Sequence, residues 1–275
     1  MSMGTLGGFP NPPATSSAGQ SPATLTRSKK IVVLGATKGM GRAIARRFAE
    51  RGDAVFLLGR GGDDLDKSAR DLEVRGGRAA SSVGTANCDL ERPDGFTAAL
   101  DAAEANLGGL DIVVVTAAMF ATQDRLEADP ELARRLLTAN FANTVVFCEQ
   151  ARRRLLARGG GTLCVFSSVA GERGRKPVII YGAAKAGLSR YLEGLDHKFR
   201  AQGLRTICVK PGFVRTGMTE GLPTPPFAGD ADGVAARVVR AIDRGSPEVY
   251  APGIWRWIMF AIRLLPRFVM RKIGF

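Results

Sequence analysis

Short apolar runs alternate along the chain with longer stretches in which apolar residues recur at helical spacing. The short runs predict strands near residues 30–34, 54–59, 83–88, 111–117, 162–167, 205–210 and 247–251. Strands that alternate with helices in this way are typical of a parallel sheet covered by helices. The pattern therefore predicts an α/β fold with one doubly wound parallel sheet.

The composition agrees with a single folded domain that has a different segment at each end. A chain of 275 residues can bury a large core. Residues 1–28 are rich in Gly, Pro, Ser, Thr and Ala and contain one base, Arg27, which predicts a disordered arm without the apolar core of a signal peptide. We expect residues 29–253 to form the domain and residues 254–275 a separate terminal segment.

The residues that most often bind metals or act as nucleophiles give no such signal here. Cys88, Cys148, Cys164 and Cys208 are widely spaced and lie in or beside predicted core elements, so we expect buried, reduced thiols and no metal site. The single histidine, His197, has no Gly-x-Ser-x-Gly partner motif. It is interpreted as a surface or packing residue, which argues against a serine hydrolase.

A glycine-rich loop joins the first predicted strand to a helix. The apolar run Lys30–Leu34 leads into Gly35-Ala-Thr-Lys-Gly39-Met-Gly41, and residues 42–49 have helical spacing. Glycines allow the backbone to approach a phosphate closely, and the N-terminus of a helix presents free N–H groups and positive potential. This strand–loop–helix order predicts a nucleotide site in a Rossmann-like fold.

Tyr181 and Lys185 are one helical turn apart, and Ser168 precedes Tyr181 by thirteen residues. The spacing places a phenol and an ammonium on one helix face, where the cation would lower the phenol's pKa from its usual ~10. Such a tyrosine can exchange a proton with an alcohol or a ketone during hydride transfer. The pair alone is weak, and it gains weight from the predicted nucleotide site.

Together these motifs resemble the short-chain dehydrogenase/reductase family from about Lys30 to Pro252. The motifs that carry the resemblance are the glycine loop, Asp89 after the third strand, Asn140 in a helix, Ser167–Gly171, Tyr181 with Lys185, and Pro211–Thr216. The resemblance implies a Rossmann-like α/β fold, a homodimer or homotetramer, and oxidation or reduction at a CH–OH or carbonyl carbon.

The resemblance also assigns roles to individual residues. Ser168 would hold the substrate oxygen, Tyr181 would be the general acid or base, Lys185 would tune the tyrosine and bind the nicotinamide ribose, and Asn140 would anchor a water. Asp89 would contact the adenine, and Thr216 would face the other end of the cofactor. The full expected cofactor set is Gly35, Thr37, Lys38, Gly39, Met40, Gly41, Arg60, Asp89, Ala117, Tyr181, Lys185, Pro211, Gly212, Val214 and Thr216.

The chain departs from the family pattern at two places. Leu34 stands where the family usually has Thr, and Val115-Thr-Ala-Ala118 replaces the usual Asn-Asn-Ala-Gly. The first Asn normally ties strands together, so we expect packing to replace a local hydrogen bond here. Neither change affects the proton-transfer residues.

Two bases favour NADP(H), although NAD(H) stays possible. Arg60 directly follows the second strand, where NAD enzymes generally place an acid, and Lys38 lies inside the glycine loop. Either base could pair with a 2′-phosphate. Asp63 and Asp64 follow closely and could weaken the preference.

The C-terminal segment is basic and amphipathic. Residues 254–275 contain five bases and no acid, with Arg256, Arg263, Arg267 and Arg271 on one stripe and Ile258, Ile262, Leu265 and Val269 opposite. Pro266 is expected to divide the segment into two helices. The segment either lies on an anionic membrane surface, as the net charge of +13 favours, or packs on the body or a second subunit. No motif for binding nucleic acid is present.

Four stretches are more specific than the family motifs, namely Ser167–Arg173, Tyr181–Gly187, Val209–Met218 and Tyr250–Phe268. With them, residues 165–275 resemble one branch of the family, the decaprenylphosphoryl-2-keto-erythropentose reductases. That resemblance implies a polyprenylphosphoryl 2-keto-pentose as substrate, a flavin oxidase partner that makes the ketone, and a cytoplasmic protein peripheral on the inner face of the membrane. The residues by themselves predict a carbonyl reductase with a basic tail. The alternatives are a reductase of another hydrophobic ketone and a non-catalytic dinucleotide-sensing regulator.

Overall fold

The computed structural model describes residues 28–76 and 83–274, so that all but Ser28 of the predicted N-terminal arm lies outside the described residues. The main sheet has the strand order β3-β2-β1-β4-β5-β6-β9, and every neighbouring pair is parallel. All seven predicted strands are present and the predicted fold class is confirmed. The strands are β1 (Lys30–Leu34), β2 (Ala54–Gly59), β3 (Gly84–Asn87), β4 (Ile112–Val115), β5 (Gly161–Phe166), β6 (Leu204–Pro211) and β9 (Glu248–Ala251).

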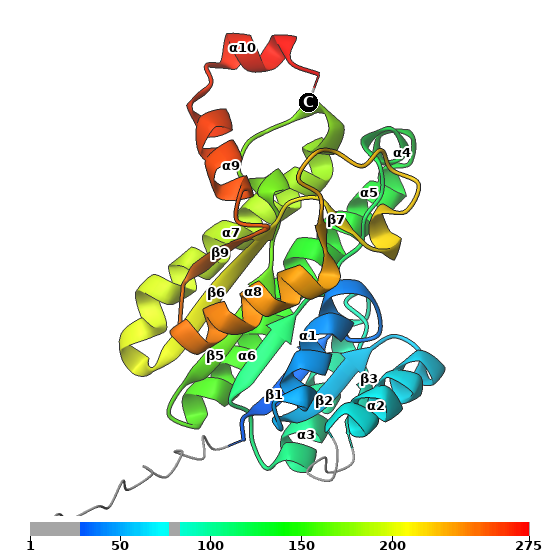
Figure 1. The fold of residues 1–275 in the computed structure, drawn as a ribbon, viewed down its shortest axis with the longest axis vertical. Coiled ribbons are helices and arrows are strands. Elements are labelled where there is room, and N and C mark those ends of the chain that lie inside the picture. The colour runs from blue at the N-terminus through cyan, green and yellow to red at the C-terminus, as the bar shows by residue number, and fades with distance from the viewer. Residues whose placement is uncertain (1–27, 77–82, 275) are drawn as a thin grey trace, which may run out of the picture.

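Helices cover both faces of this sheet (Figure 1). One face carries α1 (Gly39–Glu50), α2 (Gly62–Gly76) and α8 (Ala231–Arg244), and the other carries α3 (Phe96–Leu107), α6 (Thr144–Ala157) and α7 (Ile179–Phe199). The remaining helices are α4 (Gln123–Ala128), α5 (Pro130–Leu137), α9 (Trp255–Leu264) and α10 (Arg267–Lys272), with a π-helical turn at Thr138–Asn143. A two-residue pair, β7 (Val214–Arg215) and β8 (Gly229–Asp230), was not predicted.

Alternation along β1 explains why the apolar run is continuous. Ile31 and Val33 belong to the core beneath α1, α2 and α8, whereas Val32 and Leu34 belong to the core on the opposite face. Because both faces of a parallel sheet are covered, neither set of side chains faces water. The four predicted buried thiols lie in or beside these cores and are free.

The C-terminal segment folds into two helices that Pro266 separates, as predicted. Along α9 the structure agrees with the alternative of packing on the body, because Ile262 is buried and Ile258 packs in the same cluster, beside Trp255 and Met259. The predicted aliphatic stripe therefore faces the protein along α9. None of the helices in the described ranges has both the length and the apolar content needed to cross a bilayer.

A buried group of charges holds α9 against the end of the sheet. The Glu172 carboxylate lies 2.6 Å from Lys210 Nζ and 3.2 Å from Arg263 Nη1, and it accepts a 3.0 Å hydrogen bond from the Tyr250 hydroxyl. Lys210 also contacts Glu248. Burial alone would raise the pKa of Glu172, but these partners hold that pKa below its usual value. The group joins the loop after β5, the ends of β6 and β9, and α9.

The aromatic pair between α3 and α6 offers a test of the core on that face. Phe96 and Phe147 are both fully buried and meet edge to face, with ring centroids 5.4 Å apart. Phe147→Ala should lower the free energy of unfolding by ~3–5 kcal/mol, because it removes a buried ring and leaves a cavity. Chemical denaturation measures this change. Val74→Ala, at a side chain that is 83% exposed, is the control, and an equal effect of both substitutions would contradict this view of the core.

Candidate active site

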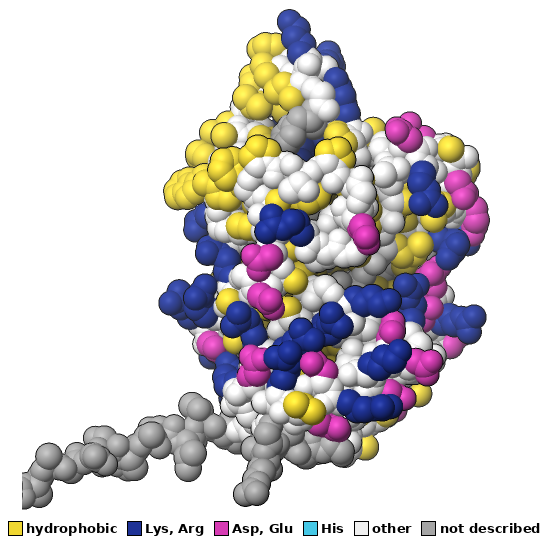
Figure 2. All heavy atoms as spheres, turned by 45° about the vertical axis from the view of Figure 1, so that its right-hand side comes forward, with side chains coloured by type: hydrophobic (Ala, Val, Ile, Leu, Met, Phe, Trp, Pro, Cys, Tyr) yellow, Lys and Arg dark blue, Asp and Glu magenta, His cyan; other side chains and the backbone are white. Residues whose placement is uncertain are grey.

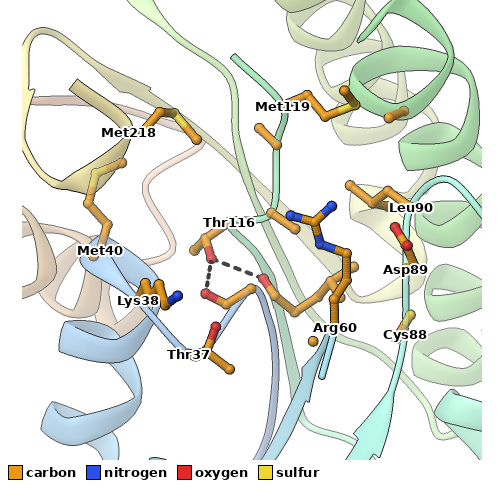
Figure 3. Close-up of a pocket in the computed structure, with 18 of the residues that line it drawn as sticks. Thr37, Lys38, Met40, Arg60, Cys88, Asp89, Leu90, Thr116, Met119 and Met218 are labelled. Carbon is orange, nitrogen blue, oxygen red and sulfur yellow. Dashed lines mark hydrogen bonds between the residues drawn. The ribbon is translucent and has the colours of Figure 1, made fainter. Parts of the chain in front are cut away.

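A cavity of about 400 Å³ opens at the carboxyl ends of the strands, beside the point between β1 and β4 where the strand order reverses. Open parallel sheets bind ligands at this position. Figure 3 shows its wall, which comes from the glycine loop, the ends of β2, β3 and β4, and the segment after β7. The residues are Leu34, Gly35, Thr37, Lys38, Gly39, Met40, Gly41, Gly59, Arg60, Asp64, Cys88, Asp89, Leu90, Glu91, Thr116, Ala117, Ala118, Met119, Ala139, Thr216, Gly217 and Met218.

The first and third glycines of the loop are required by close approaches of the backbone. A Cβ on Gly35, which has φ +90°, would lie 2.6 Å from Ala117 N, and one on Gly41 would lie 2.2 Å from Gly35 O. Any larger residue would push the loop away from the end of β4. The sequence pattern at this loop thus follows from the way the loop packs on the neighbouring strand.

Thr116 adds a hydrogen bond at this contact. Its hydroxyl Oγ1 lies 3.0 Å from Leu34 O and 3.1 Å from Gly35 O, and it donates to these carbonyls (Figure 3). Val115, at the position of the first Asn of the family motif, is buried in the core, so packing replaces that side chain's hydrogen bond as expected. The Thr116 hydroxyl, at the second position, adds a hydrogen bond between the ends of β1 and β4 that was not predicted.

The start of α1 fits an anionic group. Lys38 precedes the helix without capping it through a side chain, and the first turn contains no acidic residue. The first N–H groups of the helix therefore lack side-chain acceptors, and the dipole makes this end positive. With the glycine-lined approach, these residues fit the phosphates of a dinucleotide.

Lys38 and Arg60, the two bases expected to select the cofactor, both line the cavity. Lys38 belongs to the glycine loop and Arg60 follows the end of β2 (Figure 3). Lys38 Nζ lies 3.0 Å from Asp64 Oδ2, and Arg60 Nη1 lies 3.8 Å from Glu91 Oε2. The side chains of Lys38 and Arg60 are 79% and 68% exposed. Lys38 lowers the pKa of Asp64. Each base is thus accessible to a ligand but already has an acidic neighbour.

Asp89 lines the opposite side of the cavity, where Figure 3 shows it beside Cys88 and Leu90. Its carboxylate accepts a 3.0 Å hydrogen bond from Glu91 N, which holds the turn after β3. Leu90, Thr116, Met119 and Met218 also line the cavity and were not predicted. The first three lie at or just after the ends of predicted strands, which could have identified them from the sequence. Met218 lies in a loop for which the sequence shows no such pattern.

None of the residues expected to transfer protons belongs to the cavity wall; Asn140 and Lys185 are buried, and Ser168 and Tyr181 are partly exposed. Asn140 is fully buried in the π-helical turn Thr138–Asn143, within the helical stretch that was predicted. Its side chain accepts a 2.7 Å hydrogen bond from Met119 N and donates a 2.8 Å bond to Met119 O. Asn140 therefore fixes a residue of the cavity wall.

Tyr181 and Lys185 both lie on α7, one turn apart, as predicted. The Tyr181 ring meets Phe120 edge to face at 5.3 Å, and Lys185 Nζ lies 5.8 Å from the Tyr181 ring centroid. The buried ammonium donates a 2.8 Å hydrogen bond to Phe166 O, at the end of β5. Ser168 follows that strand end by two residues, so the sheet and α7 bring the three side chains into one region.

The expectation of a lowered tyrosine pKa is wrong for this chain. Burial raises the pKa of Tyr181 to about 12, and its interaction with the Ser168 side chain offsets only part of that effect. Burial also lowers the pKa of Lys185 to about 8. Removal from water disfavours the charged form of each group, and it is the largest cause of both shifts. The phenol is accordingly held as a proton donor at neutral pH.

The remaining predicted cofactor residues come from the last residue of β6 and the segment that follows it. Thr216 lines the cavity, but Pro211, Gly212 and Val214 do not. Val214 is buried, and a Cβ on Gly212 would lie 2.1 Å from Trp255 Nε1. Gly212 thus allows the first residue of α9 to pack directly on the backbone beside the site.

Comparison with known proteins agrees with this geometry. The family model described as short chain dehydrogenase matches residues 29–225. An uncharacterized oxidoreductase of Mycobacterium tuberculosis is 32% identical over 248 residues, which cover 90% of this chain and 98% of the relative.

One further relative and one solved structure carry more specific descriptions. The cis-4-hydroxycyclohexanecarboxylate dehydrogenase of Sinomonas cyclohexanicum is 33% identical, over 70% of this chain and 76% of its own length. A structure of actinorhodin polyketide ketoreductase with NADPH shares the fold, with a TM-score of 0.72, 23% identity, and coverage of 81% of this chain and 95% of the other. The chain belongs to the short-chain dehydrogenase family, whose members are NAD(P)-binding oxidoreductases that act on CH–OH and carbonyl groups.

Proposed function

We propose that the protein is an NADP(H)-dependent carbonyl reductase in which Tyr181 is the general acid. The observation that carries this proposal is the position of Tyr181, between Ser168 and the buried Lys185, at the same edge of the sheet as the glycine-lined cavity. A phenol with a raised pKa retains its proton at neutral pH, as donation to a ketone requires.

The reduction adds a hydride to the carbonyl carbon and a proton to its oxygen. A bound nicotinamide supplies the hydride. Ser168 donates a hydrogen bond to the carbonyl oxygen, Tyr181 transfers the proton to it, and Lys185 holds positive charge beside the phenolate that forms. In this proposal a water beside Asn140 returns a proton to Tyr181, while the Asn140 side chain itself fixes Met119.

The substrate in this proposal is a lipid-linked keto sugar, a polyprenylphosphoryl 2-keto-pentose. The resemblance of residues 165–275 to the decaprenylphosphoryl-2-keto-erythropentose reductases supports it. A flavin oxidase would supply the ketone, and a homodimer or homotetramer would act at the cytoplasmic face of the membrane. Four large apolar side chains that remain exposed on α9 and α10 also support a lipid-facing role, namely Trp257, Phe260, Leu264 and Phe268.

The proton-transfer role predicts the effect of removing one oxygen atom. Tyr181→Phe should lower the turnover number ~10²–10⁴-fold, because acid catalysis is lost, and should leave folding and NADPH binding unchanged. NADPH oxidation with a reactive diketone measures the rate. Tyr191→Phe is the matched control on the same helix, since the Tyr191 hydroxyl bonds Glu149 at 2.8 Å. A Tyr181→Phe enzyme with near-native turnover would contradict the proposal.

The cofactor assignment predicts a change in one KM alone. Arg60→Ala should raise the KM for NADPH ~10–100-fold and barely change that for NADH, because a charge-assisted contact to the 2′-phosphate contributes ~1.5–3 kcal/mol. Steady-state kinetics with both cofactors measure this. Arg70→Ala, at an exposed arginine of α2 outside the cavity wall, is the control. Equal changes for NADPH and NADH would show that Arg60 does not bind the 2′-phosphate.

Membrane attachment predicts that the exposed apolar side chains enter the lipid surface. The side chains of Trp257, Leu264 and Phe268 are 67%, 69% and 65% exposed. The triple serine variant W257S/L264S/F268S should bind anionic vesicles at least ~100-fold more weakly, since fully burying each residue contributes ~1.5–3 kcal/mol. Co-sedimentation measures binding, and Val74→Ser is the control. If the intact protein does not sediment with anionic vesicles at low salt, the attachment is wrong.

A further inference from the structure

A second cavity lies outside the active site, between α8 and the beginning of α9. Its volume is about 630 Å³, and its wall contains four arginines, Arg237, Arg240, Arg244 and Arg256. The first three lie on one face of α8, because steps of three and four residues return to the same side of a helix. Arg256 comes from α9, which follows β9 at the upper end of the molecule (Figure 1).

The positive charge of this cavity is not balanced within the described part of the chain. Arg237, Arg240 and Arg244 are exposed and make no hydrogen bond or ion pair among the described residues. The only acid in the cavity wall is Glu248, and its carboxylate already pairs with the buried Lys210. Arg51, by contrast, pairs with Asp53 and with Asp243, the latter also on α8.

The arginines also have a defined position relative to α9. A Cβ on Gly253 would lie 2.6 Å from Arg237 Nη2, so the guanidinium rests against the turn that begins α9. Arg205 packs near Gly245 at the other end of α8, where a Cβ would lie 3.3 Å from Arg205 Cδ. The basic face thus extends along α8 to the start of the terminal helices.

An apolar surface adjoins this basic cavity. A smaller cavity, lined by Glu248, Tyr250, Arg256, Trp257, Phe260 and Arg263, shares its first three residues with the arginine-lined one. Trp257 and Phe260 are 67% and 51% exposed. Figure 2 shows hydrophobic side chains gathered over the upper end of the molecule, where α9 and α10 lie, above a body of mixed charge. A ligand that fits both surfaces carries a phosphate next to hydrocarbon.

We propose that the arginine face of α8, with Arg256, binds the phosphate of an anionic phospholipid head group while the apolar residues of α9 enter the adjoining acyl region. Guanidinium groups match phosphate oxygens in geometry and charge, and aromatic and basic side chains together are typical of an interfacial helix. This inference rests on the proposed membrane attachment and names the lipid class that the attachment selects. It also fixes the docked face, which includes α8 and not only the terminal segment.

The test compares vesicles of phosphatidylcholine alone with vesicles that also contain phosphatidylglycerol. The variant R237Q/R240Q/R244Q should lose about 100-fold in affinity for the phosphatidylglycerol vesicles. Each base near an anionic surface strengthens binding about five-fold, and the variant removes three. The control K67Q/R70Q/R153Q removes the same charge from α2 and α6 and should lose much less. NADPH-dependent reduction of a soluble diketone and thermal unfolding should be unchanged in both variants. None of the six substituted residues lines the active-site cavity.

The outcomes separate this inference from the proposal on which it rests. If the intact protein ignores both kinds of vesicle, membrane attachment itself is wrong. If it binds and W257S/L264S/F268S weakens it, but R237Q/R240Q/R244Q behaves like its control, attachment stands and the head-group site is wrong. If R237Q/R240Q/R244Q binds vesicles normally but loses thermal stabilisation by pyrophosphate, the cavity takes a soluble anion, which overturns the lipid assignment.

Discussion

The close approach of the glycine loop to the end of β4 is the constraint on which the site depends. Gly35 and Gly41 leave no room for a Cβ, and the Thr116 hydroxyl joins the two strand ends through the carbonyls of Leu34 and Gly35. This contact lies where the strand order reverses and the flanking loops diverge, so it opens the cavity beside the start of α1. The positions of Lys38 and Arg60 relative to that cavity follow from it.

A second constraint connects the catalytic region to the terminal helices. Glu172 follows Ser168 by four residues and is held by Lys210, Tyr250 and Arg263. Breaking a buried ion pair by removing one partner is costly, because the other charge stays in a poorly hydrated place. The orientation of α9 is therefore tied to the segment that carries Ser168, although the two are far apart in the sequence.

Identical residue types have different roles according to their neighbours. Lys38 and Arg60 have acidic residues within 3.0 and 3.8 Å, which moderates the positive potential where a cofactor phosphate would bind. The arginines Arg237, Arg240 and Arg244 of α8 have no acid partner among the described residues, so their charge is available to an external anion. The net charge of +13 does not distinguish these cases, because it counts residues without their surroundings.

The sequence by itself determined the parallel sheet, the glycine loop, the spacing of Tyr181 and Lys185, and the break at Pro266, since each rests on local periodicity or on one residue's backbone geometry. It did not determine the hydrogen bonds of Thr116, the raised pKa of Tyr181, or which side chains of α9 are exposed. It also did not show that Arg256 joins the arginines of α8 in one cavity. Burial and the distances between segments far apart in sequence set these properties, and only the packing of the whole chain brings those segments together.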